Sequence, residues 1–286
     1  MSRVDLSNML TDELERLSAR SKAQAIAVAL HDLENDARFS LCGDRWFHAA
    51  STIKVGVLLA LFRAADEVRV RLDDSLHVRN RFISAADGSP FHLNRDSDAM
   101  PDLYQSIGRT AKIFALAKGM ISSSSNLATN LLLDFLGVEY ARKVLRDAGV
   151  NGVELRRGVE DHAAHGRGTN NEATANGLLT LLAALRGDFL SSESKEQAIH
   201  ILLQQRFNSM IPAGLPAHAA VAHKTGEIST ACHDMGIVYL PEREPYIAVI
   251  LTEFDSEQDG RRETVAAISQ AIYRSVMGME LKSNEH

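Results

Sequence analysis

The sequence is poor in cysteine, has no excess of basic residues and contains no long apolar run. Two cysteines, Cys42 and Cys232, stand among 286 residues, so at most one disulfide is possible and a disulfide framework is excluded. We expect both to be buried thiols. The net charge of -6 and the lack of a lysine- or arginine-rich block argue against nucleic acid or an anionic membrane surface as a partner. Without 18 consecutive apolar residues, the chain predicts no membrane span.

The amino-terminal segment also lacks an export signal. The stretch "MSRVDLSNMLTDELERLSARSKAQ" is polar and amphipathic, without the apolar core that a signal peptide needs. As it stands, the sequence predicts a cytoplasmic protein. A periplasmic or secreted protein whose leader had been trimmed would look the same, so the sequence leaves the compartment open.

Motifs for several other chemistries are missing. The G-x-S-x-G turn of α/β-hydrolases is absent, and "GRGTNN" lacks the third glycine and the preceding strand of a dinucleotide-binding loop. His162 and His165 form H-x-x-H without a third ligand motif, so we predict solvated loop histidines and no metal site. The sequence implies no cofactor.

Hydrophobic periodicity predicts an α+β fold with strands at both ends of the chain. A helix over 6–21, a hairpin over 25–44 and a helix over 51–68 that is apolar on nearly all sides come first. Helical patterns fill the middle, over 104–121, 126–137, 138–149, 174–187 and 194–205. Strand-like runs follow over 219–227, 234–241 and 246–254. An amphipathic helix closes the chain, with Asp259 as its expected cap and Gly278 at its end.

The strands at the two ends pair most simply into one antiparallel sheet that the terminal helices cover. We therefore predict a two-lobed molecule, with residues 1–59 and 212–286 in a sheet lobe and residues 60–211 in a helical lobe. A cleft between two such lobes is the expected place for a small-molecule site.

Ser51 and Lys54 open the apolar run "STIKVGVLLALF". Three residues apart on a helix, their side chains lie on one face, one turn apart. A serine hydroxyl becomes a good nucleophile when a base takes its proton, and a poorly solvated lysine can have a pKa low enough to be that base. The helix amino terminus adds N–H groups that suit an oxyanion. The alternative is a serine cap followed by a surface lysine, but a solvated lysine does not fit this apolar run.

Two further motifs follow in order. The stretch "MISSSSNLATNLLL" holds Ser124 and Asn126 as S-x-N, and "VAHKTGEI" holds Lys224, Thr225 and Gly226 as K-T-G on a strand-like run. In this order, S-x-x-K, S-x-N and K-T-G are the motif set of class A β-lactamases and penicillin-binding proteins. The flanking text "FHAASTIKV" and "SSNLATNLLL" also resembles elements of the class A family. Most of the chain thus resembles a class A β-lactamase or penicillin-binding-protein-like serine hydrolase.

The resemblance implies catalytic roles for three matched residues. Ser51 would be the acylated nucleophile, and Lys54 would lower the cost of its deprotonation. Ser124 would pass a proton to the leaving nitrogen, because an amine does not depart as an anion. A helix cap at Ser124 is the structural alternative, although such alternatives explain the ordered set of motifs poorly.

The other matched residues would bind the substrate. Asn126 would offer its amide to the substrate's side-chain amide, whereas Lys224 and Thr225 would bind a substrate carboxylate. Gly226 would let the strand approach the ligand closely. The backbone N–H groups of Glu227 and of the nucleophile would form the oxyanion hole.

This sequence departs from the class A pattern in the loop that serves deacylation. In class A β-lactamases a later loop carries a Glu, followed four positions on by an Asn, and the two hold the water that hydrolyses the acyl-enzyme. Arg157 and Glu160 in "ELRRGVEDHAAHGRGTNNEATANGL" resemble that loop, but position 164 is Ala164. Asn170 or Asn171 could replace the missing Asn only in a loop that is built differently.

Glu160 is our candidate for the base that activates the deacylating water. The structural alternative is an ion pair between Glu160 and Arg156 or Arg157, with Asp161 capping a turn; such exposed pairs add little stability. Glu172 is a second candidate.

The segment over 79–104 looks longer than its class A counterpart. It has turn chemistry over 87–90 and aromatic side chains at Phe82, Phe91 and Tyr104. A mobile flap over the cleft would fit this composition, but we expect an ordinary surface excursion. His223 and His233 flank the K-T-G turn, and either line the cleft or pack beside it.

These observations together predict a monomeric serine β-lactamase that hydrolyses the β-lactam amide of a small molecule through an acyl-Ser51 intermediate. One alternative is a penicillin-binding-protein-like D,D-peptidase or esterase that acts on a peptidoglycan-like peptide or a small ester. Another is a β-lactam sensor that is acylated once without turnover. The loop that carries Glu160 distinguishes them, because an enzyme without a deacylating base stalls as the acyl-enzyme.

Overall fold

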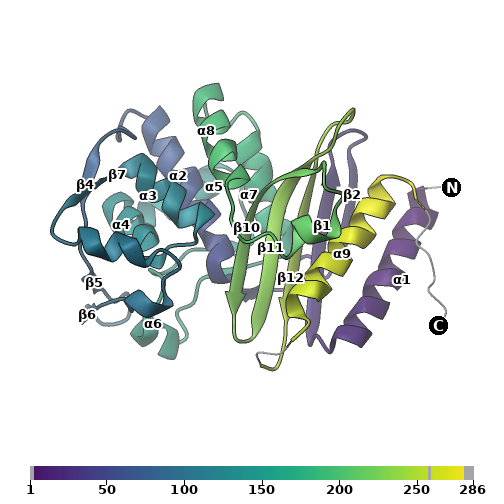
Figure 1. Ribbon diagram of the computed structural model, residues 1–286, viewed down its shortest axis with the longest axis horizontal. Coiled ribbons are helices and arrows are strands. Elements are labelled where there is room, and N and C mark those ends of the chain that lie inside the picture. Colours follow the sequence, from purple (N-terminus) through teal and green to yellow (C-terminus); the bar gives the residue numbers. More distant parts are fainter. Residues whose placement is uncertain (1–2, 257–258, 280–286) are drawn as a thin grey trace.

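The computed structural model describes residues 3–256 and 259–279 of the chain (Figure 1). Its α-helices are α1 (Arg3–Ser21), α2 (Lys54–Asp66), α3 (Ile113–Ser122), α4 (Asn126–Leu136), α5 (Val138–Asp147), α6 (His162–Gly166), α7 (Ala175–Arg186), α8 (Ser192–Leu203) and α9 (Arg261–Val276). The long strands are β1 (Ala25–Asp32), β2 (Ala37–Leu41), β10 (Ala220–Ile228), β11 (Ala231–Tyr239) and β12 (Tyr246–Glu253). The short strands are β3 (Phe47–His48), β4 (Ser75–His77), β5 (Phe82–Ile83), β6 (Pro90–Phe91), β7 (Thr110–Lys112), β8 (Val153–Glu154) and β9 (Glu172–Ala173).

One antiparallel sheet joins the two ends of the chain. Its strand order is β10-β11-β12-β1-β2, so the amino-terminal hairpin pairs through β1 with the carboxy-terminal β12. The register sets Ala27 opposite Leu251, and Lys224 opposite Met235. The predicted hairpin and sheet are confirmed. Because β10 is an edge strand, its K-T-G residues can face another part of the molecule.

The two faces of the sheet bury different side chains. Side chains alternate between faces along a strand, so Ile26 and Val28 of β1 pack in the cluster that includes residues of α1 and α9, whereas Ala27 and Ala29 pack in the cluster of the helical part. In Figure 1, α1 and α9 lie side by side on one face, and α7 and α8 lie on the other. The sheet is therefore the middle layer of a three-layer arrangement.

Helix α2 runs through the centre of the helical part. Its residues from Val55 to Phe62 are all buried, as the apolar pattern over 51–68 predicts. It packs against α4, α5, α7 and α8, which surround it on several sides. A 3-10 turn over Ala50–Ile53 precedes it and contacts β10. The buried helix thus fixes Ser51 and Lys54 beside the edge of the sheet.

Two predicted element boundaries are wrong. The helix predicted over 104–121 begins only at Ile113, because a 3-10 turn that starts at Pro101, then Gly108 with φ of 84°, and then β7 occupy the preceding stretch. Asp259 does not cap α9; Gly260 is the cap residue, with φ of 87°, and makes no side-chain hydrogen bond. Gly278 follows α9 with φ of 65°, as expected of a glycine at a helix end.

The two cysteines are unpaired thiols. Cys232 is fully buried in β11, as predicted. The prediction that Cys42 is buried is wrong, because this residue lies just after β2 in a turn that exposes it.

The fold is the predicted two-lobed α+β arrangement of an antiparallel sheet and a helical part. Helices α7 and α8 contact the sheet strands as well as α2, so they form the layer that joins the two lobes. The exact division at residues 59/60 and 211/212 stays a prediction. Within residues 3–256 and 259–279, no helix is both long and apolar enough to cross a membrane.

Candidate active site

Ser51 lies in the 3-10 turn that precedes α2, and Lys54 is the first residue of that helix. Side chains three residues apart in a 3-10 turn are aligned, so the two side chains lie on one side of it. Ala50, directly before the serine, has a positive φ of 47°. The turn therefore holds Ser51 at the mouth of the buried helix.

Lys54 is completely buried, and its ammonium group is fully hydrogen-bonded. Its Nζ atom donates to the backbone oxygen of Ser124 at 2.7 Å, to Ser124 Oγ at 3.2 Å and to Asn126 Oδ1 at 2.6 Å. Burial lowers the pKa of Lys54 to about 7, although the charges of Asp98 and Glu160 oppose this shift. Near neutral pH a large fraction of Lys54 is therefore an uncharged amine, which is able to accept a proton.

Ser124 receives hydrogen bonds from two lysines. Besides the bond from Lys54, Lys224 Nζ donates to Ser124 Oγ at 3.0 Å and to the backbone oxygen of Thr225 at 2.7 Å. Burial, and next the charge of Lys54, lower the pKa of Lys224 well below its usual value, whereas Asp234 raises it. The hydroxyl of Ser124 is thus a bridge between two amines whose protonated forms are disfavoured.

Three loops at this site contain a non-glycine residue with positive φ. These residues are Ala50 (47°), Ser124 (55°) and Glu160 (57°). Each such left-handed residue costs about 1–3 kcal/mol and persists where surrounding contacts hold it. The strain lies where the chain must bring three distant segments together.

Asn126 joins Lys54 to Glu160. Its Oδ1 atom accepts from Lys54, and its Nδ2 atom donates to Glu160 Oε1 at 2.6 Å. Asn126 is the first residue of α4, and Ser125 rather than Ser124 caps this helix by accepting from Ala128 N. The expected alternative of a helix cap at Ser124 is therefore wrong.

The loop that carries Glu160 is held by other residues. Asn171 Oδ1 accepts from the backbone N–H groups of Arg156 at 2.8 Å and Arg157 at 3.1 Å, and Asn170 Oδ1 accepts from Arg157 at 3.2 Å. Both asparagines thus bind the loop itself. Glu160 accepts from Asn126 Nδ2 and, at 3.4 Å, from Ser97 Oγ.

The ion pair between Glu160 and Arg156, which was the structural alternative to a catalytic role for Glu160, is wrong. Arg156 pairs with Glu172 at 2.5 Å and with Glu154 at 3.7 Å, not with Glu160. Glu172, the second candidate base, lies on β9 and is bound to Arg156. Asp161 does cap a turn, as expected: it accepts from Ala164 N at the start of α6.

The segment over 79–104 is more than a surface excursion, because part of it borders the site. Ser97 and Ala99 line the cleft. Between them Asp98, 6% exposed, accepts from Leu127 N at 2.8 Å and from Ser125 Oγ at 3.3 Å. Sequence reasoning missed Asp98, because no motif links an acid in this segment to the amino terminus of α4.

The site opens into a cleft of about 230 Å³. Gly226 lies against the 3-10 turn: a Cβ atom on it would come within 3.1 Å of Ser51 N and Thr52 N. Residues of the three motifs and residues of other segments line the cleft together. The lining residues are Ser51, Ser97, Ala99, Ser124, Asn126, Phe207, Ser209, Met210, Thr225, Glu227 and Arg262.

Of the predicted substrate-binding residues, Asn126, Thr225 and Glu227 line the cleft. Lys224 contacts Ser124, and Gly226 lies against the turn of Ser51. Six lining residues lie outside the motifs: Ser97, Ala99, Phe207, Ser209, Met210 and Arg262.

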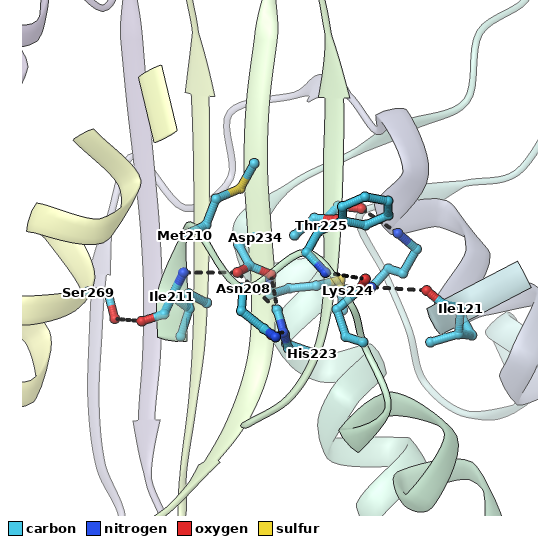
Figure 2. A network of polar contacts seen from close by, with 12 residues as sticks. Ile121, Asn208, Met210, Ile211, His223, Lys224, Thr225, Asp234 and Ser269 are labelled. Carbon is cyan, nitrogen blue, oxygen red and sulfur yellow. Dashed lines mark hydrogen bonds and ion pairs between the residues drawn. The ribbon is translucent and has the colours of Figure 1, made fainter. Parts of the chain in front are cut away.

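A buried polar network supports one wall of the cleft (Figure 2). Asp234 hydrogen-bonds with His223 Nδ1 at 3.0 Å and accepts from Ile211 N at 3.0 Å, and His223 Nε2 lies 3.0 Å from Asn208 Oδ1. His223 is therefore a packed residue that holds the segment over 208–211, whose Ser209 and Met210 line the cleft. His233 is also buried, which lowers its pKa to about 4.

Two other histidines, His48 and His165, contact each other edge to face, with ring centroids 6.2 Å apart. His162 and His165 are exposed, as predicted, but they lie on the short helix α6 and not in a loop. Among the residues that the structure describes, no three His, Cys, Asp or Glu side chains lie close enough to hold a metal ion.

Comparison with known proteins identifies the family. The model of the β-lactamase enzyme family matches residues 9–276 of the chain. The chain belongs to the β-lactamase enzyme family. Beta-lactamase ROB-1 of Haemophilus influenzae is 26% identical to it over 258 residues, which are 88% of this chain and 79% of the relative.

Solved structures agree with this membership. The structure of PBP-A matches with a TM-score of 0.81 at 26% identity, and covers 96% of this chain and 97% of that chain. An ancestral class A β-lactamase matches with a TM-score of 0.80 at 26% identity, over 93% of this chain and 99% of that chain. This member of the β-lactamase family is thus a serine hydrolase with the class A fold.

Proposed function

We propose that this serine β-lactamase opens the β-lactam amide through an acyl-enzyme on Ser51, and that Lys54 is the base of the acylation step. The observation that carries the proposal is the position of Lys54: fully buried, with a pKa of about 7, one turn from the serine hydroxyl. As the hydroxyl oxygen attacks the carbonyl carbon, its proton passes to the uncharged amine.

The oxyanion formed in this step would be bound by the backbone N–H groups of Ser51 and Glu227. Gly226, which lies against Ser51 N without a side chain, supports this arrangement because it allows β10 to approach the 3-10 turn. Donors fixed in this way lose no free energy to reorganisation as charge develops on the oxygen.

Ser124 would deliver the proton to the leaving nitrogen. The hydroxyl lies between Lys54 and Lys224, so it can give its proton to the nitrogen and be reprotonated by Lys54, which took the proton of Ser51. The C–N bond then breaks, with the nitrogen leaving as a neutral amine.

Lys224 and Thr225 would bind the substrate carboxylate, and Asn126 the substrate's side-chain amide. Lys224 is buried and its pKa is lowered, so an approaching anion favours its protonated form. The hydroxyl of Thr225 lines the cleft beside it. Binding of an anionic ligand would thus favour protonation of Lys224.

Glu160 would activate the water that hydrolyses the acyl-enzyme. Its carboxylate is joined through Asn126 to Lys54, which supports a position next to the acylated serine. Every residue in the proposal comes from one chain, so a monomer suffices for the reaction.

Intact-mass measurement of the protein during exposure to benzylpenicillin tests the proposal. We expect a transient adduct on the wild type, with product accumulating, and no adduct or turnover on Ser51→Ala. Undiminished hydrolysis by Ser51→Ala would refute the assignment of the nucleophile.

A second candidate function is acylation without efficient turnover, as in a penicillin-binding-protein-like D,D-peptidase or a β-lactam sensor. Two observations favour it: the absence of an Asn four positions after Glu160, and the similarity to an acyl-enzyme complex of a PBP-A mutant with penicillin G, with a TM-score of 0.80 at 26% identity. In the same time course, this function would give a permanent stoichiometric adduct. An esterase would give no adduct with penicillin.

A further inference from the structure

Glu227 presents a carboxylate to the cleft, in addition to its backbone N–H group. Its side chain is 28% exposed and lines the cleft together with Ser51 and Thr225. Thr225 and Glu227 are two residues apart on β10, so their side chains lie on the same face of the strand, about 7 Å apart. A negative charge therefore lies next to the hydroxyl that would bind a substrate carboxylate.

Two arginines at the start of α9 hold this carboxylate. Arg262 donates to Glu227 Oε2 from Nε at 3.0 Å and from Nη2 at 2.8 Å. Arg261, 4% exposed, donates to Glu227 Oε1 at 3.1 Å and also to the backbone oxygens of Ile228 and Ser229, both at 2.8 Å. Glu227 is thus fixed from two sides and cannot leave the cleft without breaking charged hydrogen bonds.

Arg262 is the matching cation. Its side chain is 54% exposed and lines the cleft, whereas Lys54 and Lys224 are completely buried. Of the described residues that line the cleft, Glu227 and Arg262 are the two with an acidic or basic side chain, and they are bound to each other. The guanidinium group that a substrate anion could reach is therefore already occupied.

We propose that the side chain of Glu227 determines the charge selectivity of the cleft: it occupies Arg262 and repels a substrate carboxylate at the Thr225 end. This inference rests on the proposed use of the cleft around Ser51. Lys224 and Thr225 can still bind a carboxylate there, but the charge of Glu227 weakens that binding, so acyl compounds that are neutral at this end should bind more tightly. Removing the carboxylate exposes Arg262 and converts the same end into a site for anions.

Equilibrium binding to a Ser51→Ala background tests this inference without any chemical step. Benzylpenicillin and its methyl ester form a matched pair of ligands that differ in one charge, and calorimetry gives their dissociation constants. Adding Glu227→Gln, which keeps the volume and the backbone N–H, should tighten benzylpenicillin binding about tenfold and leave the ester unchanged. Adding Arg262→Gln as well should abolish this gain.

Glu139→Gln is the matched control, because it removes the same charge from an exposed pair with Arg142 on α5. It should change neither dissociation constant. An equal effect of Glu227→Gln on both ligands, or a gain that survives Arg262→Gln, would overturn the inference, as would the absence of binding of either ligand to any variant. Thermal unfolding of each variant verifies the fold. Failure of the proposed function is a different result, namely no adduct on the wild type.

Discussion

Lys54 Nζ lies 2.7 Å from the backbone oxygen of Ser124, although 70 residues separate the two along the chain. This contact fixes the loop before α4 against the amino terminus of α2. The ammonium group of Lys54 also donates a hydrogen bond to the carbonyl of Ser124, a residue with left-handed backbone. A buried carbonyl without a donor would be unfavourable. A single lysine thus has a structural and a proposed chemical role.

Replacing Glu160 by Gln should separate the two halves of the reaction. The amide cannot take a proton from water, so we expect deacylation to slow by about 100-fold or more while Ser51 is still acylated. Intact mass after mixing with benzylpenicillin should show an adduct that persists. Glu172→Gln is the control, since Glu172 is bound to Arg156 and should be dispensable. Normal turnover by Glu160→Gln would show that another base acts.

The pH dependence of acylation should reveal the state of Lys54. Its pKa is lowered to about 7, so the amine is uncharged and able to act as a base above this pH and becomes protonated below it. We expect kcat/KM to fall about tenfold for each pH unit below about 7, and to be level above. Asp98 raises the pKa of Lys54, so Asp98→Asn should move this limb to lower pH. A rate that rises on acidification would exclude Lys54 as the base.

Gly226→Ala should impair acylation through one methyl group. The new Cβ would lie 3.1 Å from Ser51 N, Thr52 N and Thr52 Cγ2, which forces β10 away from the 3-10 turn. Displacement of the oxyanion donors should lower the acylation rate by about tenfold or more. Gly166→Ala is the control, because nothing lies within 4 Å of its added Cβ. Equal stopped-flow acylation rates for both variants would contradict the close approach.

Asp234→Ala should destabilise the protein and loosen the cleft wall. The buried carboxylate bonds with His223, Ile211 N and Met235 N, and its removal takes an acceptor from each of these groups. We expect the free energy of unfolding to fall by about 3 kcal/mol in urea titrations. Asp234→Asn keeps an acceptor oxygen and should lose less. Similar losses for both variants would argue against a role for the hydrogen bonds.

Much of the fold followed from local pattern. The fully apolar run of α2 and the apolar runs of β1 and of β10 to β12, which turn residues bound, are typical of the elements that they form. The wrongly predicted start of the helix over 104–121 has a different cause. The 3-10 turn that begins at Pro101 extends into the start of the predicted helix over 104–121, and Gly108 with its positive φ interrupts that helix. The spacing of apolar residues does not reveal these backbone preferences.

In the candidate site, too, local sequence predicts some features and not others. The motifs specify which chemical groups are present: an S-x-x-K at a buried helix start, an S-x-N and a K-T-G. Folding places two lysines at one hydroxyl of Ser124, Asp98 close enough to raise the pKa of Lys54, and Arg262 against Glu227. These relationships join segments far apart in the chain, and their energies depend on distance and on burial. Neither quantity exists until the chain has folded.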